Sequence, residues 1–86
     1  MKHKSIKETL RERGVTHGEF RDNARVSQNI KATIHEDAGY LHLTPIMREA
    51  LDMIAHKIGR ILAGDPTNKD SWHDIAGYAT LVEERI

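Results

Sequence analysis

Apolar residues return at three- and four-residue spacing along most of this chain. Such a period places them on one face of an α-helix, whereas a strand would alternate. The recurrence is clear over residues 20–34 and again over 44–64, and a third amphipathic stretch follows residue 68. The segment 38–43 alternates briefly, but it is too short to found a sheet, and we interpret it as a loop. The pattern predicts an all-α fold.

Two helices are predicted in the first half of the chain. Each begins at a capping box, in which a side chain at the helix start and one three residues later satisfy free backbone N–H groups. The pairs are Ser5 with Glu8 and Thr16 with Glu19. We expect the first helix to be short and peripheral, ending near Arg13 at Gly14, and the second to run to about Asp37.

The second half of the chain predicts two more helices with stronger boundary signals. An N-cap threonine and a proline at the first helical position mark the start of the third helix, and a glycine followed by a proline marks its end. The residues are Thr44, Pro45, Gly64 and Pro66, so this helix spans about 45–63. Thr67 or Asn68 caps the last helix, which runs from about Lys69 to near Arg85.

The third helix has two different faces. At about 100° per residue, one broad arc that we expect to face the core consists of Met47, Ala50, Leu51, Ile54, Ile58, Ile61 and Leu62. Glu49, Asp52, His56 and Arg60 lie on the other side. One interpretation is a solvated face with pairs such as Asp52 with His56. The other is a cation site, in which Glu49 and Asp52 bind Mg²⁺ while Lys57 or Arg60 meets a phosphate.

The fourth helix places two further carboxylates away from its apolar face. That apolar face consists of Trp72, Ile75, Ala76, Ala79 and Val82. Asp70 and Asp74 lie on the other side with Gly77 and Leu81, which indicates a cleft or an interface. A helix start accounts for Asp70 without any metal, because carboxylates favour the first turn. Asp74 lies beyond that turn and is the more suggestive acid.

Composition narrows the function classes. The 86 residues have room for one domain, 1–86, whose small core favours self-association. Because no cysteine is present, disulfides and thiolate sites are excluded, which is typical of a cytoplasmic protein. A net charge of zero argues against nucleic-acid binding, which only the basic cluster Lys2, Lys4, Lys7, Arg11 and Arg13 favours. No apolar run is long enough for a membrane span or a signal peptide.

Two resemblances add to this picture. The segments 16–20, 48–55 and 72–78 (THGEF, REALDMIA and WHDIAGY) resemble a family of small uncharacterised phage and prophage proteins. More distantly, the two acidic helices resemble the all-α nucleoside triphosphate pyrophosphohydrolases of the MazG and dUTPase type. That resemblance implies a MazG-like bundle completed by oligomerisation, with Mg²⁺ bound by Glu49, Asp52, Asp70 and Asp74. The chain departs from the pattern, because its second acidic pair is spaced by four and lacks glutamate.

Two hypotheses about function follow. The first is a Mg²⁺-dependent nucleotide pyrophosphohydrolase, in which Glu49, Asp52 and Asp74 serve catalysis and Lys57 and Arg60 bind the phosphates. The second is a non-catalytic helical phage accessory module that binds a host protein or sequesters a nucleotide. Both hypotheses expect a homo-dimer or a higher oligomer.

Overall fold

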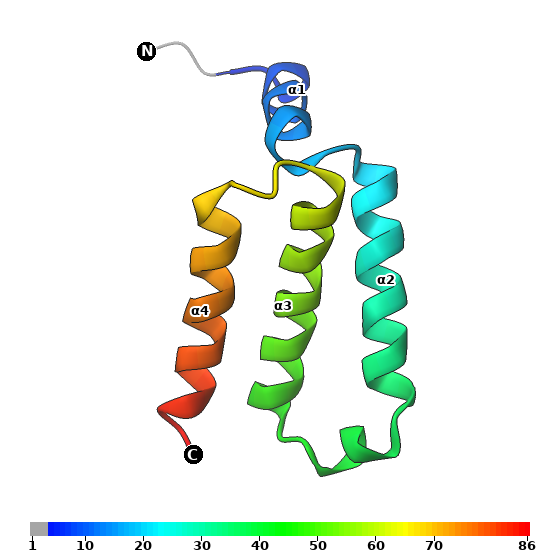
Figure 1. The fold of residues 1–86 in the computed structure, drawn as a ribbon, viewed down its shortest axis with the longest axis vertical. Coiled ribbons are helices and arrows are strands. Elements are labelled where there is room, and N and C mark those ends of the chain that lie inside the picture. The colour runs from blue at the N-terminus through cyan, green and yellow to red at the C-terminus, as the bar shows by residue number, and fades with distance from the viewer. Residues whose placement is uncertain (1–3) are drawn as a thin grey trace.

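The computed structural model describes residues 4–86 and is all-helical within that range. Four α-helices follow one another: α1 (Ile6–His17), α2 (Phe20–Glu36), α3 (Pro45–Ala63) and α4 (Lys69–Glu83). One 3₁₀ helix, η1 (Ala38–His42), joins α2 to α3 (Figure 1). The predicted all-α bundle of three main helices and a short N-terminal helix is confirmed. Lys2, a member of the basic cluster, lies outside the described residues.

The boundaries of α3 and α4 agree with the sequence prediction. The Thr44 hydroxyl accepts a hydrogen bond from the backbone N–H of Met47 at 3.3 Å, and Pro45 occupies the first turn. The Asn68 side chain accepts from the N–H of Asp70 at 2.9 Å. These bonds satisfy N–H groups that have no partner inside the helix. Local capping chemistry therefore determines where both helices begin.

The predicted end of the first helix at Gly14 is wrong. Ser5 caps α1 as expected, but the helix continues through Gly14 to His17 and stops at Gly18, which has a φ of 78°. The chain turns there because it packs backbone to backbone against the end of α3. The N–H of Asp65 donates to the Thr16 carbonyl at 2.8 Å. A side chain on Gly18 would collide with the Ala63 carbonyl.

The predicted capping box of Thr16 and Glu19 is also wrong. Thr16 lies inside α1, and its hydroxyl donates to the Glu12 carbonyl at 3.1 Å. Glu19 is the N-cap of α2 by position, but its side chain makes no capping hydrogen bond. The segment read as a loop contains η1, which begins where the Asp37 carboxylate accepts from the N–H of Gly39 at 2.8 Å.

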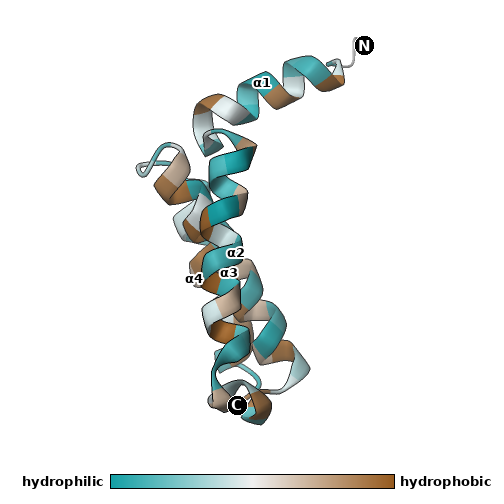
Figure 2. Ribbon diagram, turned by 90° about the vertical axis from the view of Figure 1, so that its right-hand side faces the viewer, coloured by the Kyte–Doolittle hydropathy of each residue, from teal (hydrophilic) through white to brown (hydrophobic). Residues whose placement is uncertain are grey.

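The three long helices lie side by side in one layer with α3 in the middle. Figure 1 shows α2 along one side of α3 and α4 along the other, and Figure 2 shows the same three helices edge-on. Helix α1 crosses one end of the layer and buries none of its residues. Its peripheral position is as predicted. In the part of the chain that the structure describes, no helix is both long and apolar enough to cross a membrane.

Small residues form the seams between the helices. Asn23 and Ser27 of α2 are buried against α3, where Gly59 has no side chain to keep the backbones apart. A Cβ on Gly59 would lie only 2.7 Å from the Asn23 carbonyl oxygen. In the described part of the chain only three hydrophobic residues are buried, namely Ala50, Ala55 and Ile61. The core of a single chain is therefore small.

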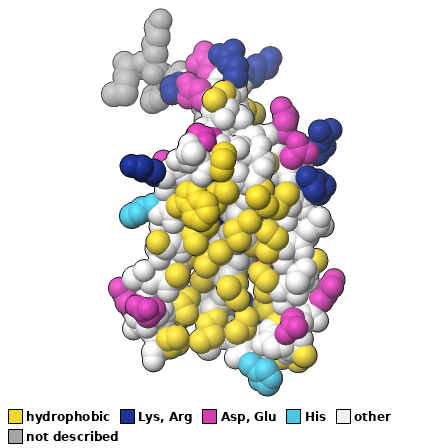
Figure 3. All heavy atoms as spheres, in the orientation of Figure 1, with side chains coloured by type: hydrophobic (Ala, Val, Ile, Leu, Met, Phe, Trp, Pro, Cys, Tyr) yellow, Lys and Arg dark blue, Asp and Glu magenta, His cyan; other side chains and the backbone are white. Residues whose placement is uncertain are grey.

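Much of the arc predicted as core remains open to solvent. Its members Met47, Leu51, Ile54 and Ile58 are only half-buried, and Leu62 is 67% exposed. With Trp72 of α4, which is 55% exposed, they form what we call the apolar face. Figure 3 shows hydrophobic side chains gathered over the middle of the layer, with charged side chains around its edges. The prediction that the whole arc is buried in the core is wrong for one chain, because no other helix of the chain covers it.

Candidate functional site

Glu49 and Asp52, the first predicted carboxylate pair, lie one turn apart on α3 and have different surroundings. Asp52 accepts a hydrogen bond from His35 of α2, with 2.7 Å between Oδ1 and Nε2. The interpretation that pairs Asp52 with His56 is therefore replaced by a contact between two helices. Glu49 lines a cavity of about 340 Å³ between the start of α3 and the end of α4, together with Tyr78 and Leu81.

Asp52 belongs to a group of side chains that ties α2, η1 and α3 together. The His35 ring lies 4.9 Å from the Tyr40 ring, measured between centroids. The Arg48 guanidinium lies 4.3 Å from the centre of the Tyr40 ring and also donates to the Tyr40 carbonyl at 3.1 Å. Aromatic and cation–π contacts of this kind stabilise a packed junction. The surroundings of Asp52 are those of a structural contact.

Asp74 and Lys57 form an ion pair between α4 and α3. Lys57 Nζ lies 2.9 Å from Asp74 Oδ2, and the lysine is buried while the aspartate is only half-buried. The hydrogen bond and the charge of Lys57 lower the pKa of the Asp74 carboxyl. Asp70 lies in the first turn of α4, where the sequence placed it. Gly77 has open space around it within 4 Å, so no helix of the described chain approaches it.

The four predicted carboxylates do not share a metal site within one chain. Asp52 pairs with α2 on one side of α3, whereas Asp74 reaches α3 from α4 on the other. Among residues 4–86, no group of three or more histidine, aspartate or glutamate side chains could hold a metal ion. We therefore derive no chemical step through Mg²⁺ from a single chain.

A second group of residues, only some of which were predicted as site residues, does lie around one cavity. A cavity of about 650 Å³ lies where α1 crosses the ends of α2 and α3. We call it the basic pocket. Its charged and imidazole side chains are Arg11, Arg13, His17, Glu19, His56 and Arg60. Apolar side chains from Leu10, Val15 and Phe20 form the rest of its wall.

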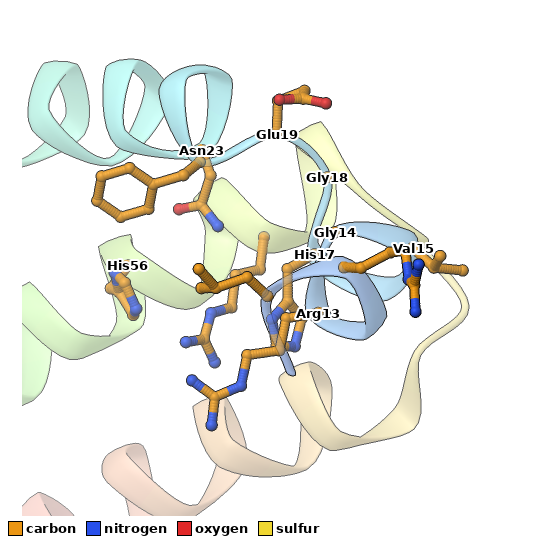
Figure 4. Close-up of a pocket in the computed structure, with 12 residues that line it drawn as sticks. Arg13, Gly14, Val15, His17, Gly18, Glu19, Asn23 and His56 are labelled. Atoms are coloured by element: carbon orange, nitrogen blue, oxygen red, sulfur yellow. The ribbon is translucent and has the colours of Figure 1, made fainter. Parts of the chain in front are cut away.

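The arginines of the basic pocket have no ion-pair partner among the described residues. Within residues 4–86, the guanidinium groups of Arg11, Arg13 and Arg60 form no ion pair. Figure 4 shows the side-chain nitrogens of Arg13, His17 and His56 on one side of the helices, while Glu19 points away from them. Cations gathered in a concave site attract anions strongly. The lining of this cavity is therefore predominantly cationic.

The pKa values of His17 and His56 reflect the burial and the positive charge of this pocket. Burial lowers the pKa of His17, and the positive charges of Arg60, Lys57 and Arg13 lower it further. Burial also lowers the pKa of His56, together with the charges of Arg60 and Lys31. Burial and neighbouring positive charges both disfavour protonation of an imidazole. The pKa values of both histidines therefore lie below that of a free imidazole.

Asn23 adds a buried polar group to the wall of the basic pocket. Its side chain is 5% exposed, and its Oδ1 atom has no hydrogen-bond partner among the described residues. Buried polar atoms are normally hydrogen-bonded, so an unpaired one calls for a local explanation. This Oδ1 atom faces the seam between α2 and α3, because a Cβ on Gly59 would lie 3.2 Å from it, so it belongs to the helix packing.

Sequence reasoning identified only part of this pocket. Arg60 was predicted as a phosphate ligand and His56 as a polar neighbour, but His17 and Arg13 were not assigned to a site. The four-residue spacing of His56 and Arg60 on one helix face was the usable signal. The sequence did not place Arg13 at this pocket, because α1 was expected to end at Gly14. In the structure α1 continues to His17, and the chain turns at Gly18.

Comparisons with known proteins place the chain in a family without assigning it an activity. Neither the curated proteins nor the solved structures include a match. One family model matches residues 3–86, which is nearly the whole chain. The chain therefore belongs to the family described as Domain of unknown function (DUF6378).

Proposed function

We propose that this protein binds a phosphorylated small molecule, with a nucleotide as the best-fitting ligand, in the basic pocket. The observation that carries the proposal is a set of three arginines without acidic partners around one cavity. Guanidinium groups bind phosphate oxygens through two parallel hydrogen bonds, which are stronger than neutral ones. The ligand would also raise the lowered pKa values of His17 and His56.

The rest of the pocket favours a nucleotide over inorganic phosphate. A volume of about 650 Å³ lies within the range of pockets for drug-sized ligands. Phe20 borders the pocket and is 81% exposed, so its ring is free to stack on a base. The side chain of Glu19, the N-cap residue of α2, accepts no hydrogen bond from the first backbone N–H groups of that helix. A helix N-terminus of this kind favours an anion.

Calorimetric titration with ADP, pyrophosphate and adenosine tests the proposal. We expect ADP to bind most tightly, pyrophosphate to bind through the arginines, and adenosine to bind weakly or not at all. Replacing Arg60 with glutamine removes a charged hydrogen bond worth about 1.5–3 kcal/mol, so ADP affinity falls roughly 10- to 100-fold. Arg25→Gln is the matched control, because Arg25 is exposed on α2 and does not line the pocket. Equal ADP affinity for both variants would contradict the proposal.

Hydrolysis and partner binding remain separate predictions. Cleavage of a nucleotide between its α- and β-phosphates, implied by the distant resemblance, requires carboxylates that one chain keeps apart. Pyrophosphate release that depends on Mg²⁺ and is lost in Asp52→Ala would support it. Recovery of a host protein on the immobilised chain, unchanged by Arg60→Gln, would instead support the accessory-module hypothesis.

A further inference from the structure

The apolar face has the composition of a protein interface. It is built from α3 and α4, its defined members Met47, Leu51, Ile54, Ile58, Leu62 and Trp72 are all uncharged, and charged side chains lie around its edges (Figure 3). An apolar centre with a polar rim is the common anatomy of stable interfaces. Contiguous apolar patches on soluble monomers rarely exceed a few hundred Å².

The exposed area of the chain supports the same conclusion. Its accessible surface is 6657 Å². A compact monomer of 9.8 kDa exposes roughly 5,200 Å², so this chain exposes about 1,500 Å² more. The projecting helix α1 accounts for part of the excess. A standard interface needs only about 800 Å² from each partner, and obligate homodimers use more. The chain therefore has enough surplus surface for a stable dimer.

We propose that two copies of this chain associate face to face through the apolar face, in a two-fold symmetric dimer. A two-fold interface needs one patch that complements itself, and an uncharged patch on one side of the helix layer meets that condition. Net charge is zero, so like-charge repulsion between copies is small. The dimer completes the core, because three buried hydrophobic residues are too few for a stable domain of this length.

Dimerisation through this face leaves the basic pocket open. Two residues nine positions apart on an α-helix are separated by about two and a half turns, so they point to opposite sides of the helix. Arg60 therefore lies opposite Leu51 on α3, and Glu49 lies opposite Ile58. Ligand binding and dimerisation occupy different sides of the layer. The dimer proposal is independent of the proposed function, and either can fail alone.

Sedimentation equilibrium with matched lysine variants tests the dimer. Leu62 is 67% exposed and belongs to the apolar face, whereas Ile46 is 50% exposed on the same helix but lines the cavity near Tyr78. We expect Leu62→Lys to raise the dimer dissociation constant at least about 100-fold, because each copy leaves an unpaired ammonium in the interface. Ile46→Lys should remain dimeric. Circular dichroism shows whether each variant keeps its helices.

Trp72 supplies a second readout, because it is the single tryptophan and is 55% exposed in one chain. Its fluorescence should shift to longer wavelength when the wild-type dimer is diluted until it dissociates. A wild-type chain that sediments as a monomer at every concentration up to the submillimolar range would overturn the proposal. A closed oligomer larger than two, or a helical Leu62→Lys variant that dimerises as well as the wild type, would also overturn it.

Discussion

Alanine at Gly59 and alanine at Gly77 should change stability in opposite directions. Both glycines lie inside helices, so each substitution gains about 1 kcal/mol of helix propensity. At Gly59 the new methyl group would lie 2.7 Å from the Asn23 carbonyl oxygen and 3.4 Å from the Ser27 Cβ. Backbone atoms of α2 cannot swing aside as a side chain can. At Gly77 no atom lies within 4 Å.

The size of the difference follows from these contacts. Overpacking costs about 1–3 kcal/mol, and a 2.7 Å contact with a backbone atom belongs in the upper part of that range, at about 2–3 kcal/mol. After the propensity gain of about 1 kcal/mol, Gly59→Ala should be destabilising by roughly 1–2 kcal/mol. Gly77→Ala should be stabilising by about 1 kcal/mol. A difference of about 2–3 kcal/mol between the variants corresponds to at least about 8 °C in Tm for a domain of this size.

Thermal unfolding followed by circular dichroism measures this difference. Protein concentration must be equal in all samples, because dimerisation makes Tm depend on concentration. Gly14→Ala serves as a second control, since Gly14 is also helical with no atom within 4 Å. A Gly59→Ala variant as stable as Gly77→Ala would refute the close approach of α2 and α3.

Three further predictions follow from the same structure. Gly18→Ala should lower the free energy of unfolding by at least about 3 kcal/mol in urea titrations, because a positive φ and the Ala63 carbonyl both oppose a side chain. Asp74→Asn should lower the urea midpoint at pH 7, because it leaves the buried Lys57 ammonium unpaired. The pKa of Asp74 is lowered in the folded chain, so the difference in urea midpoint between wild type and variant should disappear as the pH falls through that pKa. The pKa values of His17 and His56 are lowered from 6.5 in the folded chain, so the unfolded chain binds more protons below that pH. The free energy of unfolding should therefore fall as the pH drops below 6.5. In the double variant His17→Gln/His56→Gln this fall should be smaller.

Local signals in the sequence were sufficient for the second half of the fold. Thr44, Pro45 and Asn68 act through hydrogen bonds and φ preferences within a few residues of themselves, so α3 and α4 begin as predicted. The junction of α1 and α2 is different. Gly18 ends α1 because the chain packs there against Ala63 and Gly64, which are more than forty residues away along the sequence. No local pattern contains that contact.

The candidate site shows the same division. Helical spacing correctly grouped Arg60 and His56 on one side of α3. It could not show that Asp52 would meet His35 or that Asp74 would meet Lys57, because each pair joins two helices. Periodicity also identified an apolar arc on α3 without showing whether the chain itself would cover it. Tertiary packing decided each of these outcomes.

Titration of the histidine rings by nuclear magnetic resonance tests the central claim most directly. The pKa values of His17 and His56 should both rise when ADP saturates the basic pocket, because a phosphate beside Arg60 stabilises the protonated imidazoles. The ring resonances of His73, which is exposed on α4 and does not line the pocket, should not move when ADP is added. Unchanged pKa values for His17 and His56 at saturating ADP would contradict the proposed ligand site.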